Sequence, residues 1–130
     1  MALDVNALSS EVEEFLTVRH LATLTTLRAG GRPHVVPVGF SWDGAAGVVR
    51  IITRAGSQKA RNAGLPGAVG AVCQIDGGRW LTLSGPAQVT DEPDRVAEAV
   101  RRYAARYRDP EPRADRVAIE ITVTEILGRA

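Results

Sequence analysis

The sequence predicts a mainly β protein, in which about six antiparallel strands close into a small barrel flanked by short helices. Most apolar residues fall in short segments rich in β-branched side chains, as in strands. Glycine-marked turns join consecutive segments at Gly30-Gly31, Asp43-Gly44 and Gly77-Gly78. Because such tight turns join antiparallel neighbours, the pattern favours a meander over a doubly wound α/β fold.

Composition narrows the class of protein. The 130 residues predict one domain, 1–130, and 45% of them are hydrophobic, which is enough for a core. With a net charge of only +1, the protein lacks the broad positive electrostatic field that would attract nucleic acid or anionic lipid. Neither a membrane-spanning run nor a secretory signal pattern is present. Cys73 is the only cysteine, so an internal disulfide is excluded, and we expect a cytoplasmic protein.

The first elements are a helix and two strands. Ser10 and Glu13 match a capping box, which predicts a helix over 10–19. A strand is expected over 20–27, and an alternating strand over 33–42. Pro37 cannot donate to a β-ladder, so this second strand has an unpaired edge, a bulge or a ligand beside it. The alternation places five residues on one face of this strand: His34, Val36, Val38, Phe40 and Trp42.

Further strands and helices alternate along the rest of the chain. We expect strands over 48–53, 67–75, 79–89 and 116–123, and helices over 54–63 and from Pro93 to about Tyr107. Gly85-Pro86 predicts a bulge or a bend at a barrel corner. Thr90 or Asp91 would cap the later helix. In the last strand Val117, Ile119, Ile121 and Val123 would face inward, and Arg116, Glu120 and Thr122 outward.

The chain lacks the common signatures of self-sufficient catalysis. It has two histidines and one cysteine, and the GxSxG, HExxH, Walker and GxGxxG patterns are absent. A hydrolytic triad, a catalytic metal and classical dinucleotide binding are therefore poorly supported. If the protein is an enzyme, an external cofactor carries the reaction.

The segment 53–62 has the chemistry of a phosphate site. It lies where a strand gives way to a helix, whose first amides point outward unpaired. Ser57 offers a hydroxyl, Gly56 permits close approach, and Lys59, the only lysine in the chain, offers a compact charge. The alternative interpretation is an ordinary capped helix with solvated basic residues.

Two other segments are candidates for holding a planar ring. His34–Phe40 could lie against it, although a plain edge strand explains the same residues. Trp80, beside Arg79, could stack on an aromatic ring, but a core or dimer contact is the alternative.

The order of these segments resembles the pyridoxamine 5′-phosphate oxidase-like split-barrel family, which has an FMN-binding-like fold. The resemblance covers nearly the whole chain and is most specific at Ser57-x-Lys59-x-x-Asn62 and at Arg79-Trp80-Leu81. Within that family the chain is most similar to the branch that uses the deazaflavin coenzyme F-420, and in that branch to the biliverdin reductases.

The resemblance implies a homodimer with the site at its interface. It implies that Ser57 and Lys59 bind the cofactor phosphate, supported by Thr53 and Asn62. The residues expected around the ring are His34, Val36, Pro37, Val38 and Ile52, with Arg79 and Trp80 closing the site from either subunit. The implied reaction is hydride transfer from reduced F-420 to an electron-poor acceptor, with biliverdin the leading candidate. An FMN oxidoreductase and a non-catalytic binder of the cofactor or a tetrapyrrole stay open as alternatives.

Overall fold

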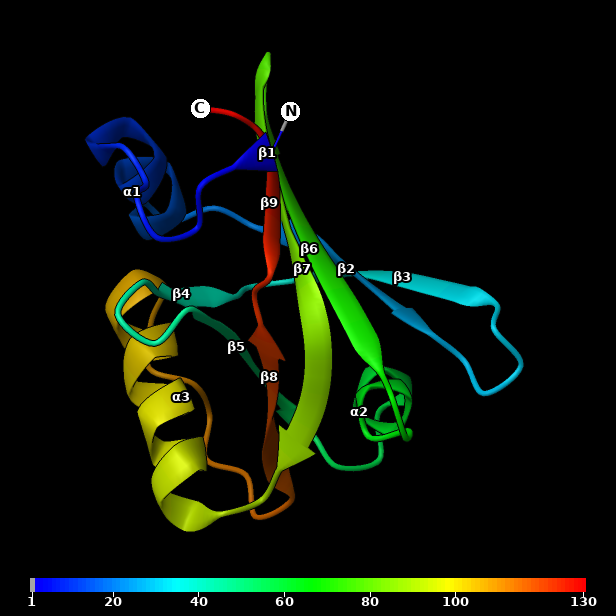
Figure 1. The fold of residues 1–130 in the computed structure, drawn as a ribbon. Helices are drawn as coiled ribbons and strands as arrows, with labels where there is room; N and C mark the ends of the chain where they lie inside the picture. The colour runs from blue at the N-terminus through cyan, green and yellow to red at the C-terminus, as the bar shows by residue number, and fades with distance from the viewer. Residues whose placement is uncertain (1) are drawn as a thin grey trace.

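The computed structural model describes residues 2–130, in which nine strands and three helices form one antiparallel sheet with flanking helices (Figure 1). In chain order the elements are β1 (Ala2–Leu3), α1 (Ser10–Thr17), β2 (Ala22–Leu27), β3 (Pro33–Val38), β4 (Ser41–Asp43), β5 (Val48–Arg54), α2 (Gln58–Ala63), β6 (Val69–Asp76), β7 (Arg79–Thr90), α3 (Pro93–Arg106), β8 (Arg116–Thr122) and β9 (Glu125–Arg129). The mainly β, antiparallel prediction is confirmed. Strands β1 and β9 were not expected, and the strand expected over 33–42 is two strands, β3 and β4.

The sheet curves into a barrel that stays split. Its strand order is β3-β2-β6-β7-β8-β5-β4, so the two ends of the path are β3 and β4. These strands are consecutive in the chain and separated only by Gly39 and Phe40. These two residues therefore connect the two ends of the sheet, and within the described residues no β-ladder pairs β3 with β4. The split barrel that the family resemblance implies is confirmed: the sheet is not closed, and β3 and β4 remain its two ends.

Strand β7 supplies the corner of the barrel. It pairs with β9 over residues 80–84 and then with β8 over residues 87–90. Gly85 lies between the two ladders, where an added Cβ would collide with the carbonyl oxygen of Thr122. The predicted bend at Gly85-Pro86 is therefore confirmed, and it requires a residue without a side chain.

The capping residues of the helices differ from those that the sequence indicated, and α2 begins later than expected. Ser9, not Ser10, caps α1 and accepts a hydrogen bond from the Val12 amide. Helix α2 starts at Gln58 rather than near residue 54, because Ser57 adopts an extended backbone and caps it. At α3 the cap position is Glu92, while the Thr90 hydroxyl accepts from the Glu92 amide.

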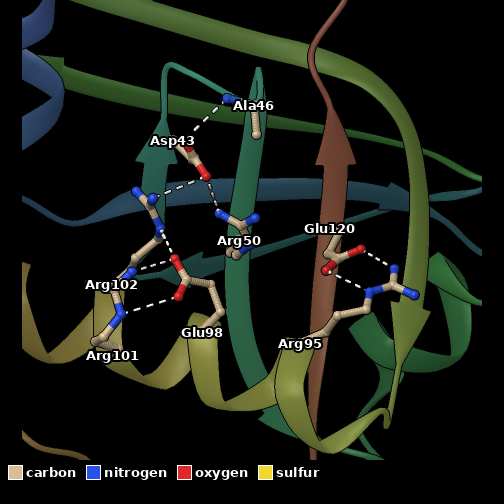
Figure 2. A network of polar contacts seen from close by, with 8 residues as sticks. All are labelled: Asp43, Ala46, Arg50, Arg95, Glu98, Arg101, Arg102 and Glu120. Carbon is tan, nitrogen blue, oxygen red and sulfur yellow. Dashed lines mark hydrogen bonds and ion pairs between the residues drawn. The ribbon is translucent and has the colours of Figure 1, made fainter.

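Strand β8 is buried on both faces, which the alternation did not predict. Glu120, expected to face outward into solvent, is only 8% exposed because α3 covers that face. Its carboxylate accepts hydrogen bonds from Arg95 of α3 (Figure 2). It also accepts one from Gln88 of β7. The other face of β8 contributes Ile119 and Ile121 to the apolar core. None of the helices in residues 2–130 combines the length and hydropathy needed to cross a membrane.

Candidate functional site

An open pocket of ≈ 370 Å³ lies between the β3 edge, the end of β5, helix α2 and the connection from α3 to β8. Five of the predicted site residues line it: Pro37, Val38, Ile52, Thr53 and Lys59. The remaining lining residues are Gly39, Ile51, Arg54, Tyr103, Pro110, Arg113 and Arg116. The pocket thus joins the predicted ring-binding strand to the predicted phosphate segment.

Several residues that line the pocket are apolar. Pro37 and Val38 come from β3, which pairs only with β2 and is an edge strand, as Pro37 indicated. Ile52 belongs to β5, and Tyr103 reaches the pocket from α3. Tyr103 and Tyr107 pack so closely on Gly39 that a Cβ there would lie 3.1 Å from the Tyr107 ring. This apolar lining suits a planar ring better than a flexible polar ligand.

Other residues that line the pocket are cationic. Arg54, Lys59, Arg113 and Arg116 line it, and its lining includes no carboxylate. Within residues 2–130 Lys59 has no hydrogen-bond or ion-pair partner in the structure. Burial, followed by the positive charge of Arg54, lowers the pKa of the Lys59 amine. A bound anion would favour the charged form of Lys59 and so offset both effects on its pKa; the electrostatics of the pocket therefore favour an anionic ligand.

Ser57 holds the start of α2. Its hydroxyl accepts from the Ala60 amide and lies 3.1 Å from the Thr53 hydroxyl. Ser57 is 7% exposed and does not line the pocket, although Thr53 does. The hydroxyl pair therefore fixes the turn between β5 and α2, and with it the position of Lys59 two residues later.

Asn62 is also an internal support. Its side-chain amide donates to the Thr26 hydroxyl at 3.0 Å, and its carbonyl oxygen accepts from Gln58 at 2.7 Å. Only 2% of Asn62 is exposed. These contacts tie α2 to β2, so Asn62 acts on the site through the helix.

Besides Ser57 and Asn62, four predicted residues do not line this pocket in one chain. His34 and Val36 lie on β3 outside the pocket lining; Val36 packs against the apolar core, and Nδ1 of His34 is buried without a partner among the described residues. Arg79 pairs with Asp76 at 2.9 Å, and Trp80 follows it on β7. Both lie at the β6–β7 hairpin, which Figure 1 shows at the far end of the sheet from α2.

Helix α3 is anchored so that Tyr103 faces the pocket. Asp43 of β4 binds Arg102 at 3.1 Å and Arg50 at 2.8 Å (Figure 2). One turn further along the helix, Arg106 donates to the carbonyl oxygens of Val18 and Phe40. Arg102 and Arg106 are therefore occupied with internal contacts.

Sequence reasoning missed Tyr103, Arg54, Arg113 and Arg116 as pocket residues. Tyr103 lies in the helix expected from Pro93 to about Tyr107, and nothing in the helical pattern distinguishes a core residue from a pocket wall. Arg54 is far from Arg113 and Arg116 in the sequence, and it meets them only because β5 pairs with β8. Their one signal is that each flanks a predicted strand.

Comparison with known proteins gives four relevant similarities. Residues 8–130 match the family model described as pyridoxamine 5′-phosphate oxidase. A biliverdin reductase of Mycobacterium tuberculosis (strain CDC 1551 / Oshkosh) that depends on reduced F-420 is 50% identical over 123 residues, which are 95% of this chain and 89% of the relative.

Two solved structures have the same fold. An F-420 reductase superposes with a TM-score of 0.72 at 30% identity, covering 88% of this chain and 94% of that one. A conserved hypothetical protein from Mycobacterium tuberculosis gives a TM-score of 0.78 at 22% identity over 95% of this chain and 85% of that one. The second similarity concerns the fold alone.

Proposed function

Since the chain belongs to the pyridoxamine 5′-phosphate oxidase family, we propose that it is a reductase that binds coenzyme F-420 and reduces an electron-poor acceptor, with biliverdin as the leading substrate. One observation carries the proposal: apolar residues and a group of cations without a lining carboxylate line a single pocket. The 50% identical relative acts on biliverdin with reduced F-420, and the F-420 reductase shares the fold.

The residues present fit a phosphate-bearing ring cofactor. Lys59 would hold the phosphate, since its ammonium has no acceptor among the residues that the structure describes. Ser57, Thr53 and Asn62 would keep that ammonium in place through the β5–α2 turn and helix α2. Pro37, Val38 and Ile52 would lie along the ring. When bound, the reduced cofactor supplies a hydride, and the protein contributes orientation, exclusion of water and charge stabilisation.

The proposed assembly is a homodimer with two sites at its interface. Strands β3, β2, β6, β7 and β9 leave an outer face almost free of charge, with Val35 and Ile75 56% and 59% exposed. Exposed apolar faces of this kind mark interaction surfaces. His34, Val36, Arg79 and Trp80 do not line the pocket of their own chain, so we propose that Arg79 and Trp80 act at the partner's site. A cytoplasmic location stays a prediction.

Turnover tests the proposed function. Reduced F-420 and biliverdin mixed with the protein should bleach the long-wavelength band of biliverdin. Turnover with FMN in place of F-420, or a yellow protein as purified, would move the function to an FMN oxidoreductase of the same fold. Tight binding of coenzyme or tetrapyrrole without hydride transfer would indicate a non-catalytic binder.

Lys59→Ala tests the phosphate contact. A charge-assisted hydrogen bond contributes about 1.5–3 kcal/mol, so the dissociation constant for F-420 should rise about tenfold to a hundredfold. Fluorescence titration measures this, with Arg108→Ala as a matched control because Arg108 is exposed and outside the pocket. Unchanged binding in Lys59→Ala would remove the phosphate assignment.

The affinity of the wild type for F-420 should also depend on pH. It should fall as the pH rises through the lowered pKa of Lys59, because the neutral amine has no charge for the anion.

A further inference from the structure

The pocket holds more positive charge than one phosphate contact uses. Lys59 comes from α2, whereas the three arginines come from elsewhere: Arg54 ends β5, Arg116 begins β8, and Arg113 precedes it in the connection from α3. Arg113 is partly neutralised by Asp115, whose carboxylate lies 3.2 Å away. Arg54 and Arg116 have no ion-pair partner in the part of the chain that the structure describes.

Arg54 and Arg116 are direct neighbours across a β-ladder. The register of β5 and β8 places them opposite each other, as the last pair of that ladder. Like charges directly opposite each other destabilise a sheet. Arg116 donates to the Glu111 carbonyl oxygen, which orients its guanidinium without cancelling its charge. The repulsion is thus built into the strand pairing. The Asp115 carboxylate is near enough for the charge of Arg54 to contribute to its lowered pKa, but within the described residues it forms an ion pair with Arg113 and not with Arg54.

The two kinds of cation suit different anions. A lysine ammonium is a compact point charge, whereas a guanidinium presents a planar fork that matches the two oxygens of a carboxylate. Lys59 is on the helix side of the pocket and the two arginines are on the strand side. A ligand with two separate anionic groups would therefore satisfy both.

We propose that Arg54 and Arg116 form a second anion subsite, which takes a carboxylate and is distinct from the phosphate contact of Lys59. The inference rests on the proposed function for the identity of the ligand, but the subsite can be tested by binding alone. Two ligands of the proposed reaction carry carboxylates: the acceptor, through propionate groups such as those of biliverdin, and the coenzyme, through the glutamyl groups of its tail.

Arg54→Gln tests the subsite by ligand affinity. The variant loses one guanidinium that has no internal hydrogen bond, so folding should be unaffected. Four ligands separate the sources: biliverdin, its dimethyl ester, F-420 and FMN, which carries a phosphate but no carboxylate. The dissociation constant of the carboxylate ligand should rise about tenfold to a hundredfold. Arg108→Gln removes the same charge from an exposed position outside the pocket and should change none of the four.

The pattern of losses decides the outcome. A loss for biliverdin that its dimethyl ester does not share assigns the subsite to the acceptor. A loss for F-420 that FMN does not share assigns it to the coenzyme tail. An equal loss for FMN would mean that the arginine serves the phosphate, and no loss for any ligand would mean that it serves none; either result overturns the proposal. Failure of the wild type to bind F-420 or FMN would instead refute the proposed function, and the comparison of biliverdin with its ester would still test the subsite.

Arg54→Glu gives a readout that a purely structural role would not produce. It places opposite charges across the β5–β8 ladder, so the ligand-free protein should melt at a higher temperature than the wild type. The same variant should bind the carboxylate ligand more weakly than Arg54→Gln, because a negative charge replaces the guanidinium. A lower melting temperature would show that the wild-type pair is not repulsive and would overturn the proposal.

Discussion

Asp43→Asn is the substitution with the most clearly defined electrostatic effect in this fold. The Asp43 carboxylate is 9% exposed and binds two guanidinium groups, those of Arg50 and Arg102 (Figure 2). Arg50 is 14% exposed, and its Nε is already buried without a partner. Replacing the carboxylate by an amide of the same shape therefore leaves a buried positive charge without its counter-ion.

The size of the effect follows from those contacts. Removing one partner of a buried ion pair costs about 3–5 kcal/mol. Arg102 moderates this cost, because it is 30% exposed and keeps its contact with Glu98. The new amide oxygen can also still accept from the Ala46 amide, as the carboxylate does. We therefore expect a loss of about 2–3 kcal/mol at neutral pH, which in a chain of this size lowers the melting temperature by roughly 10 °C.

The pH dependence identifies the charge as the cause. Burial alone raises the pKa of Asp43, but hydrogen bonds from Arg50 and Ala46 and the charge of Arg102 outweigh burial, and the pKa lies below its usual 3.8. A carboxyl with a lowered pKa stabilises the fold above its unfolded pKa and loses that contribution as the pH falls through the folded pKa. The difference between wild type and Asp43→Asn should therefore be full at pH 7 and shrink in acid below the usual value.

Urea denaturation followed by tryptophan fluorescence measures this difference, since Trp42 adjoins Asp43 in β4. Asp91→Asn is the matched control, because Asp91 is exposed and takes part in none of the ion pairs found in residues 2–130. Equal stability of Asp43→Asn and wild type at pH 7, or a difference that persists unchanged in acid, would refute the assignment.

Two further predictions concern the barrel corner and the assembly. Gly85→Ala should cost about 3 kcal/mol or more, because its Cβ would collide with backbone atoms of Thr122 that cannot move away; thermal melting measures the loss. Gly78→Ala, at an open position, should be nearly neutral, and equal melting of the two variants would contradict the corner assignment. Ala71→Arg places a charge on the outer face of β6 and should convert the proposed dimer to monomer in sedimentation experiments. Ala97→Arg, on the exposed side of α3, should leave the assembly unchanged, and a dimer that survives Ala71→Arg would exclude this face as the interface.

Local signals determined much of the fold. Glycines at positive φ mark two of the hairpin turns, at Gly31 and Gly77, because that conformation carries no steric cost for glycine. Pro37 correctly indicated an edge strand, since it cannot donate to a second ladder. The strand-to-helix step before Lys59 placed a cation in the pocket, because Ser57 caps the helix through bonds between near neighbours.

Contacts between distant segments decided the rest. The short strands β1 and β9 form because they pair with each other and because β9 also pairs with β7; neither has a strong pattern of its own. The alternation of its strand places Glu120 on the outward face, yet α3 buries it. The ion pair with Arg95 offsets the cost of burying the carboxylate.

The same distinction divides the candidate site. The sequence by itself determined the residues of one short segment around Lys59, because their spacing along the chain sets their geometry. Only the tertiary structure decided that Arg54 and Arg116 meet, since a β-ladder joins positions 62 residues apart whose register no local pattern encodes. It also decided that Tyr103 is a pocket wall, because packing against Gly39 sets where that helix lies on the barrel.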